Sequence, residues 1–297
     1  MTYAAIAREK AALVERTGLL GEGLFGSQMV ARFFIEGFGT AAQRDAWRSR
    51  LASVAISEPR VGAHPKLLTT RAEENADGYA IFGEKAWVTN GPLADVFIVL
   101  AITSVEDGRK RYSAFLVPRD TPGLSIDEAA EYRALAPSRH CGLKLDGCRM
   151  PRSALLGVAG TAYEAMALPF RDVEDAVGTF GLLGALRFVV ARLAAGDDSA
   201  LSRGGLVGLA AIYAEAAEAV VGALDAGNLA QQAATLVGLR VLAAEMLQRA
   251  RSHRETFGPA EDAAIDRAFA DIEASLSVAR GPRQTRQARL GLSGKTA

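Results

Sequence analysis

Residues 83–91 of the chain read GEKAWVTNG. This segment lies among short apolar runs such as YAIFG, VFIVLAITS and YSAFLV, and turn dipeptides separate these runs. Asp-Gly occurs three times between such runs, at residues 77–78, 107–108 and 146–147. Because Asp-Gly between apolar runs is typical of tight β-hairpin turns, these positions predict antiparallel strands. We therefore expect a compact, mostly antiparallel β-domain over residues 53–157.

The segments on either side of this domain are expected to be helical. In residues 1–52, apolar side chains recur at helical spacing, and glycines separate two short helices. Residues 158–297 are alanine-rich and contain successive amphipathic segments with short connections, which predict an antiparallel bundle. The predicted fold class is therefore α+β, in the order helical segment, β-domain and helical bundle.

Several residues mark helix boundaries in the last segment. Pro169 suits the first turn of a helix that runs to about Ala195. Asn228 followed by Gln231 resembles a capping box that opens another long helix. Pro259 is predicted to start a further helix.

The composition excludes several classes of protein. Of 297 residues, 49% are hydrophobic and 23% charged, which is ordinary for a globular chain, and the formal net charge is zero. The chain therefore has no overall positive charge that would attract nucleic acid or an anionic membrane. Two cysteines suit a reducing compartment, the N-terminal residues lack a signal-peptide core, and no uninterrupted apolar run reaches the ~20 residues of a membrane span. We expect a soluble cytoplasmic protein that binds neither nucleic acid nor membrane.

Several fragments of the β-domain, in the right order, resemble the acyl-CoA dehydrogenase family. GEKAWVTNG is similar to the family's G-E-K-x-W-I-T-N-G, and ISEP with Gly62 is similar to V-T-E-P-x-x-G. The fragments AFLVP, TPGL, RMP and LLG follow at the family's positions. The resemblance implies the family's fold, with a truncated N-terminal helical segment, and FAD as cofactor. It also implies an acyl-CoA or other acyl thioester as substrate, oxidised at Cα–Cβ, with electron-transferring flavoprotein as acceptor.

The same resemblance assigns residues to the flavin. An isoalloxazine ring requires hydrogen bonds at its pyrimidine edge and N5, and a flat apolar partner. In the family, the residues similar to Ile56 and Ser57 serve the pyrimidine edge, the one similar to Thr89 reaches N5, and the one similar to Trp87 packs on the ring. The alternative is that Trp87 is a core aromatic residue and that Ser57 and Thr89 cap strands.

Two arginines of the last segment also correspond to family positions. RLAAG, residues 192–196, has the spacing of the family's R-x-x-F-G, whose arginine contacts the FAD of a neighbouring subunit, and Arg203 stands where the family usually has glutamine. Arg192 and Arg203 suit a pyrophosphate, or else they are solvated arginines flanking a loop. Because the family builds each FAD site partly from a second subunit, the resemblance implies a dimer or tetramer.

The family's catalytic glutamate has no counterpart in this sequence. Removal of an α-proton requires a carboxylate within hydrogen-bonding reach of the substrate. The stretch similar to the family's Y-E-G-T reads VARGP, residues 278–282, and the other family position falls on Phe170 or Arg171. Three nearby acids remain as candidates, although the solvated face of a helix explains them more simply: Asp172, Glu174 and Asp175. Glu164 is a further candidate.

Further departures concern the substrate side and the C-terminal segment. Members of the family usually have about three more helices before the segment similar to GFGTAAQR, residues 37–44, and Ala63 replaces a serine that contacts acyl-CoA. The three histidines lack metal-ligand spacing and are expected at solvated positions: His64, His140 and His253. Four arginines at every third position form either a solvated basic face or a strip for phosphates: Arg280, Arg283, Arg286 and Arg289.

The sequence leaves two hypotheses for the function of the protein. In the first, the chain is a FAD-binding acyl-CoA dehydrogenase-like flavoprotein, either with a displaced base or as the base-less subunit of a heteromeric dehydrogenase. In the second, it is a non-catalytic binding or scaffold protein of the same fold that has lost FAD or activity.

Overall fold

The structure, a computed structural model, describes residues 1–129, 135–258, 262–278 and 280–293. It consists of two compact units. The helical unit comprises Met1–Gly23, Leu135–Pro137 and Asp172–Ala297, and the β-sheet unit comprises Leu24–Ala134 and Ser138–Arg171. The three-part division at residues 52 and 157 stays a prediction. Pro259, and Ala279 within the VARGP stretch, lie outside the described residues.

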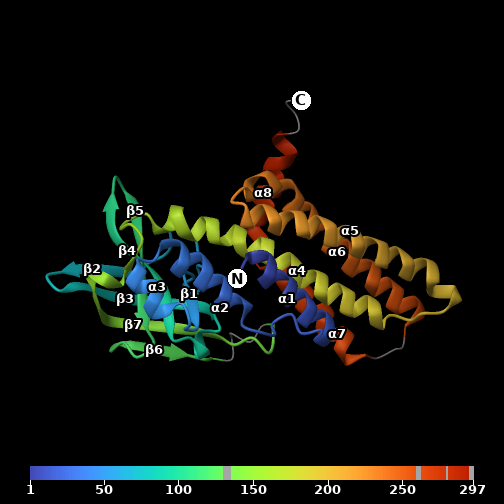
Figure 1. Cartoon of the computed structure of the whole chain (residues 1–297), viewed down its shortest axis with the longest axis horizontal. Coiled ribbons are helices and arrows are strands. Elements are labelled where there is room, and N and C mark those ends of the chain that lie inside the picture. The colour runs from blue at the N-terminus through green and yellow to red at the C-terminus, as the bar shows by residue number, and fades with distance from the viewer. Residues whose placement is uncertain (130–134, 259–261, 279, 294–297) are drawn as a thin grey trace. The chain divides into compact units, whose positions relative to one another are not determined.

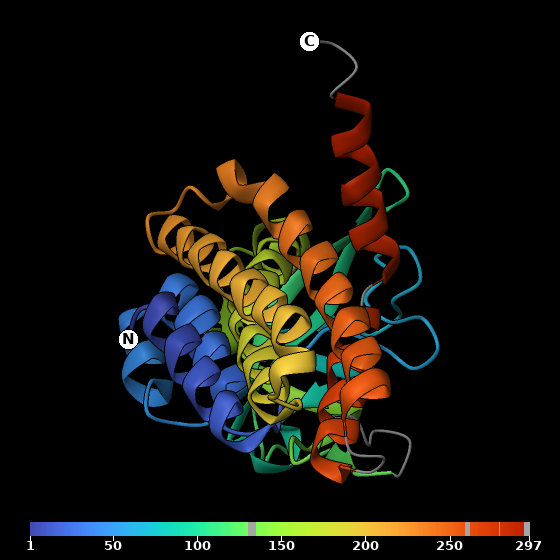
Figure 2. The same ribbon diagram turned by 90° about the vertical axis from the view of Figure 1, so that its right-hand side faces the viewer.

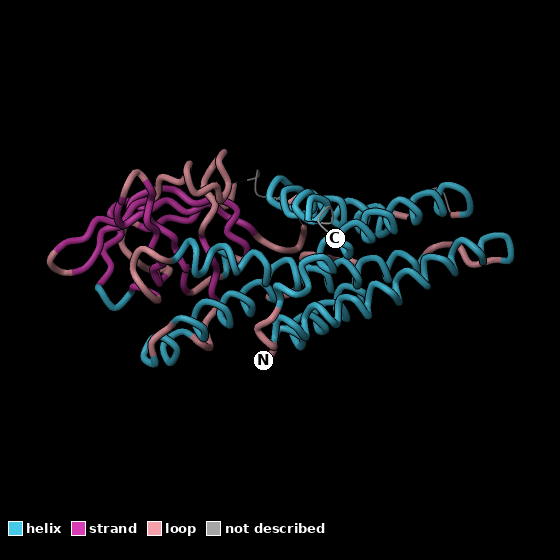
Figure 3. Tube along the Cα trace, turned by 90° about the horizontal axis from the view of Figure 1, so that it is seen from above, coloured by secondary structure: helices cyan, strands magenta, loops and turns pink. Residues whose placement is uncertain are grey.

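The β-sheet unit is built on one eight-stranded sheet, drawn in magenta in Figure 3. The strands are β1 (Ala52–Ala55), β2 (Arg71–Asn75), β3 (Gly78–Thr89), β4 (Val96–Glu106), β5 (Arg109–Pro118), β6 (Leu124–Asp127), β7 (His140–Pro151) and β8 (Leu155–Leu156). Their order is β6-β7-β3-β2-β4-β5-β8, with β1 paired to β4. Only the pairs β1–β4 and β2–β4 are parallel, so the predicted, mostly antiparallel domain is confirmed.

Two of the three Asp-Gly dipeptides form the predicted hairpins. Residues 107–108 connect β4 to β5, and both have positive φ, which the tight hairpin turn requires. Residues 77–78 lie where β2 turns into β3. The prediction is wrong at residues 146–147, because β7 continues through them. There Gly147, with φ of 69°, is an extra residue opposite β3, so it forms a β-bulge.

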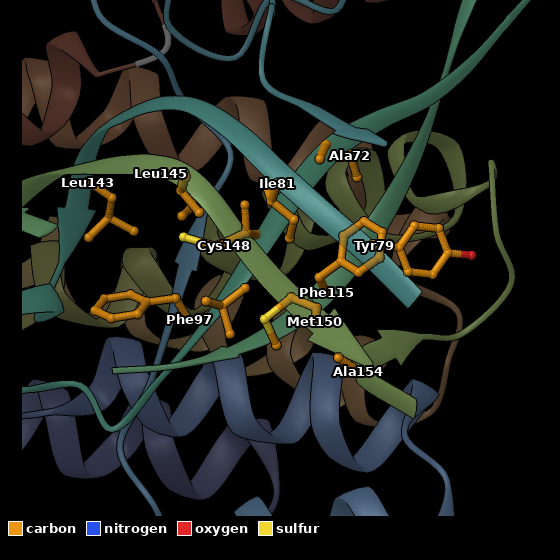
Figure 4. Packing of buried hydrophobic residues seen from close by; sticks show 14 of the residues in the cluster. Ala72, Tyr79, Ile81, Phe97, Phe115, Leu143, Leu145, Cys148, Met150 and Ala154 are labelled. Atoms are coloured by element: carbon orange, nitrogen blue, oxygen red, sulfur yellow. The ribbon is translucent and has the colours of Figure 1, made fainter. Parts of the chain in front are cut away.

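The core of the sheet is formed by apolar side chains of β3, β4, β5 and β7 (Figure 4). Tyr79 and Phe115 pack edge to face with ring centroids 4.9 Å apart. Residues 96–101 of β4 are buried on both faces, which is why this run reads as continuously apolar. The central strands therefore form a rigid support for the segments at their ends.

Short helices complete this unit. They are α2 (Phe25–Val30), the π-helix η1 (Ala31–Glu36), α3 (Ala41–Trp47) and the π-helix η5 (Tyr163–Ala167), which leads into α4 (Leu168–Arg192). Phe170 is buried against Phe33 and Phe34, with ring centroids 5.3 and 4.8 Å away. One of the two positions aligned with the family's glutamate is therefore a core aromatic residue.

The helical unit contains α1 (Tyr3–Thr17), the remainder of α4, α5 (Ala200–Asp225), α6 (Ala233–Phe257), α7 (Ala263–Ser277) and α8 (Arg280–Ser293). Figure 2 shows α5 and α6, in gold and orange, side by side. The helix predicted from Pro169 to Ala195 corresponds to α4, labelled in Figure 1. The predicted capping box at Asn228 does not form. Instead, the backbone carbonyl of Asn228 accepts a hydrogen bond from the backbone of Gln231 in a 3₁₀ turn, and α6 begins at Ala233.

Among the described residues, one helical stretch, Asp197–Asp225, is long and apolar enough to cross a membrane by length and composition. Glu215 and Glu218 interrupt its apolar run. Glu218 pairs with Arg8 of α1, and Asp225 accepts hydrogen bonds from the backbone of Tyr3 and Ala4. These contacts are those of a bundle helix, and the expectation that the chain does not enter a membrane stays a prediction.

Candidate functional site

The GEKAWVTNG stretch contains a β-bulge at the end of β3. Lys85 pairs with Leu143 and Val88 with Cys141, so one extra residue lies on β3 between these pairs. Trp87, inside the bulge, has a φ of 58° and a side chain that is 50% exposed. Positive φ at a bulky residue costs about 1–3 kcal/mol, and bulges redirect side chains. The fold therefore holds this indole outside the core at an energetic cost, and Trp87 is not a core aromatic residue.

The loop after β1 lies against this bulge. The backbone carbonyl of Ser57 accepts a hydrogen bond from Ala86 N at 2.9 Å, and the Ile56 carbonyl accepts from Lys85 Nζ at 3.2 Å. Ile56 and Ser57 are half-buried, whereas Trp87 and Thr89 are exposed. The structure thus brings together the four residues of this unit that the sequence assigns to the flavin.

A buried ion pair lies beneath this loop. Lys85 Nζ is 3.1 Å from Glu58 Oε1, and both side chains are almost fully buried. Glu58 also accepts hydrogen bonds from Thr69 and from the backbone of Thr70. Burial works against ionisation of Glu58, but Lys85 and these hydrogen bonds outweigh it and lower its pKa. Burial lowers the pKa of Lys85 to about 8, although Glu58 limits the shift.

The sequence predicted a solvated position for His140, but this residue is half-buried and contacts two residues of the site. It is half-buried at the start of β7 and pairs with Thr89 across the strands. Its Nδ1 lies 3.2 Å from Thr89 Oγ1, and its ring meets Trp87 edge to face with centroids 6.1 Å apart. The sequence held no signal for this contact, because 51 residues separate the partners.

The two arginines assigned to FAD lie in the helical unit. Arg192, at the end of α4, is exposed and places its guanidinium 3.9 Å from the ring centroid of Phe188. Arg203 of α5 is half-buried, and its Nε donates to the Val190 carbonyl at 3.3 Å. Arg203 therefore caps the C-terminal turn of α4, and both residues contribute positive charge near the α4–α5 connection.

The start of α5 also lines a cavity of about 490 Å³ with residues of α6 such as Gln248 and Phe257. His253 lies on its wall. It is 2% exposed, with Nδ1 2.9 Å from Ser202 Oγ and Nε2 3.2 Å from the Ala194 carbonyl. The expectation of a solvated His253 is therefore wrong, because its ring joins α6 to the α4–α5 connection. His64, by contrast, is exposed as expected.

Two of the three candidate acids of α4, Asp172 and Asp175, form ion pairs inside the helical unit. Asp175, whose side chain is 3% exposed, accepts hydrogen bonds from Arg283 Nε at 3.0 Å and Arg286 Nη1 at 3.1 Å. Asp172 pairs with Arg286. Two of the four C-terminal arginines therefore join α8 to α4, which neither a solvated face nor a phosphate strip predicts.

The remaining acids are exposed. Glu174 interacts electrostatically with Lys10 of α1, where burial lowers the pKa of the lysine and Glu174 partly offsets that effect. Glu164 is exposed in η5 of the β-sheet unit. Neither carboxylate is in the desolvated setting that raises the reactivity of a general base.

Comparison with known proteins agrees with this geometry. Residues 53–148 match the family described as "Acyl-CoA dehydrogenase, middle domain". Mouse mitochondrial short-chain specific acyl-CoA dehydrogenase is 33% identical over 133 residues, which cover 43% of this chain and 32% of the mouse protein. The chain thus spans well under two thirds of that relative. The similarity to the acyl-CoA dehydrogenase family is therefore carried by residues 53–148, which match its middle domain, and the curated relatives are similar over part of their length.

Solved structures extend the similarity to almost the whole chain. An acyl-CoA dehydrogenase from Geobacillus kaustophilus has a TM-score of 0.80 at 19% identity, covering 98% of this chain and 83% of that one. A glutaryl-CoA dehydrogenase from Mycobacterium smegmatis in complex with FADH2 has a TM-score of 0.72 at 22% identity, covering 99% of this chain and 87% of that one. These similarities show the acyl-CoA dehydrogenase fold, with N-terminal helices, a central β-sheet domain and a C-terminal helical bundle.

Proposed function

We propose that this chain is a FAD-binding flavoprotein of the acyl-CoA dehydrogenase family whose β-sheet unit holds the isoalloxazine ring. The observation that carries the proposal is Trp87, held exposed by a strained bulge, with its ring and the hydroxyl of Thr89 both in contact with His140. A flat apolar face, hydroxyl groups and backbone polar groups in one place fit the requirements of the ring.

Each residue has a defined part in this proposal. Trp87 packs on the ring, Thr89 reaches N5, and Ser57 with the backbone of Ile56 serves the pyrimidine edge. Arg192 and Arg203 supply positive charge for a pyrophosphate, in keeping with a site completed by a second subunit. The cofactor supplies the hydride acceptor for oxidation of an acyl thioester at Cα–Cβ.

We further propose that the chain lacks a catalytic base of its own and works with a second acyl-CoA dehydrogenase-like subunit. Phe170 is a core residue, and the carboxylates of Asp172 and Asp175 are paired with guanidinium groups of arginines. An acid in such ion pairs is poorly placed to remove an α-proton, which requires a free carboxylate beside the substrate. Electrons would then pass to an electron-transferring flavoprotein.

The cofactor proposal is tested by the visible spectrum of the purified chain, before and after incubation with FAD. We expect flavin absorption bands in the folded protein and release of FAD on denaturation. A colourless protein that does not take up FAD would overturn the proposal and favour a scaffold of the same fold.

The base-less proposal is tested by adding a panel of acyl-CoA thioesters to the FAD-loaded chain without oxygen. We expect no bleaching of the flavin by the chain alone, and bleaching when the chain is co-purified with a partner subunit. Bleaching by the chain alone that Asp172→Asn or Glu174→Gln abolishes would instead identify a displaced base.

A further inference from the structure

We propose that His140 is a positioning residue that sets whether the Thr89 hydroxyl presents a hydrogen-bond donor or an acceptor to the flavin. The inference rests on the proposed binding of FAD by the β-sheet unit. It starts from the 3.2 Å separation of His140 Nδ1 and Thr89 Oγ1, and from the edge-to-face contact of His140 with Trp87. His140 thus contacts two of the residues assigned to the ring.

The backbone fixes this arrangement. Thr89 and His140 are directly paired in the antiparallel β3–β7 ladder, and the next pair is Val88 with Cys141. The Thr89 carbonyl accepts a hydrogen bond from Ser53 Oγ at 2.8 Å, and the backbone of Asn90 donates to the Arg139 carbonyl at 2.7 Å. Both ends of the pair are therefore tied to the sheet, and the imidazole can act on the hydroxyl with little loss of side-chain freedom.

The chemistry follows from the single proton of a hydroxyl group. If Nδ1 bears no hydrogen, Thr89 donates its proton to the imidazole and presents oxygen lone pairs to a ligand. If Nδ1 bears a hydrogen, it donates to Oγ1, and the Thr89 proton is free to bond a ligand acceptor. Flavin N5 accepts a hydrogen bond when oxidised and carries a hydrogen when reduced, so the state of this pair favours one redox form.

The experiment measures the two-electron reduction potential of the FAD-loaded full chain in a double-mutant cycle of wild type, His140→Ala, Thr89→Val and the double variant. One hydrogen bond of about 1.4 kcal/mol corresponds to a tenfold change in the relative binding of reduced and oxidised FAD. We therefore expect His140→Ala to shift the potential by about 30 mV in the wild-type background. In the Thr89→Val background the shift should largely disappear, because the hydroxyl through which His140 acts is gone.

The sign of the shift in reduction potential shows which of the two groups, Thr89 Oγ1 or His140 Nδ1, donates the hydrogen bond. A fall in potential on removing His140 means that Thr89 donates to Nδ1, and a rise means that Nδ1 donates to Thr89. Equal shifts in both backgrounds, or no shift in either, would overturn the inference while the bound flavin still supports the proposed function. A chain that does not bind FAD would overturn both.

Matched controls separate positioning from general damage. His64→Ala removes an exposed histidine from a loop of the same unit and should leave the potential unchanged. Thr89→Ser retains the hydroxyl and should preserve most of the response to His140→Ala. Because Thr89 is exposed and His140 half-buried, thermal unfolding of these variants should remain close to that of the wild type.

Discussion

The β-sheet unit and the helical unit each bury a carboxylate in an ion pair, but the two pairs have different surroundings. Glu58 and Lys85 lie beneath the loop and bulge that carry Ser57 and Trp87. Asp175 and its arginines join one helix of the bundle to another. The same kind of interaction thus supports a candidate ligand site in one unit and helix packing in the other.

The similarity to known proteins divides in the same way. The family's middle domain matches residues 53–148, which lie in the β-sheet unit except for Leu135–Pro137. The solved structures extend the match to 98–99% of the chain, at 19–24% identity. The residues proposed to contact the flavin lie in the segment that matches the family model, whereas Asp172 and Asp175 of α4 pair with arginines of α8.

The largest effect is expected from the buried pair of the β-sheet unit. Lys85→Met should lower the free energy of unfolding by about 3–5 kcal/mol, because it leaves Glu58 as an unpaired buried charge. Urea denaturation measures the loss. Arg71→Met, which removes the exposed pair of Arg71 with Glu73, is the matched control and should cost less than ~1 kcal/mol. Similar losses for the two variants would contradict the account.

The pair of the helical unit should give a smaller effect. Asp175→Asn should lower the free energy of unfolding by about 2–3 kcal/mol, because it weakens the bonds to Arg283 and Arg286, which retain partial access to water. Asp172→Asn, whose side chain is 47% exposed, should cost less than ~1 kcal/mol. Flavin absorption should be unchanged in both variants. A loss of bound FAD would show that this pair also supports the flavin site.

The change in unfolding free energy at acidic pH should distinguish the buried Glu58–Lys85 pair from exposed charges. The folded state holds the pKa of Glu58 below its ordinary value of 4.5. Glu58 therefore contributes stability above that value, and the contribution is lost as pH falls through the folded pKa. Denaturant unfolding between pH 7 and pH 3 should show a shallower decline in Glu58→Gln than in the wild type. Parallel declines would contradict this assignment.

The smallest effect concerns the strained bulge. At an ordinary strand position alanine is more stable than glycine, but φ of 58° at Trp87 reverses this order. The free energy of unfolding should therefore be about 1 kcal/mol higher for the Trp87→Gly variant than for the Trp87→Ala variant. Thermal or urea unfolding of the apo protein measures the difference. If alanine is the more stable variant, the backbone is not strained there.

Local signals in the sequence predicted much of the β-domain. The Asp-Gly pair at residues 107–108 forms its hairpin because turn geometry depends on adjacent residues. At residues 146–147 the same dipeptide forms a bulge, because pairing with β3 prevails over the local preference. The place of the proposed site is a prediction from the family's residues near Trp87, but the positive φ at Trp87 arises from strand register.

Long-range partners were beyond the reach of the sequence. The Thr89–His140 contact, and the pairing of Arg283 with Asp175 across 108 residues, depend on how distant segments meet. An arginine repeat indicates a charged helix face but not which carboxylates it will meet. Likewise, Phe170 could be aligned with a family glutamate, yet only packing shows that Phe33 and Phe34 enclose it.

The central claim is that FAD binds to the β-sheet unit on the exposed face of Trp87. It is tested most directly by titrating FAD into the apo form of the full chain while following tryptophan fluorescence, in parallel with Trp87→Phe. The chain has two tryptophans, Trp47 and Trp87, so the variant retains an internal reference. We predict saturable quenching in the wild type and much weaker quenching, with lower affinity, in Trp87→Phe. Equal quenching in the two proteins, or none in either, would contradict the claim.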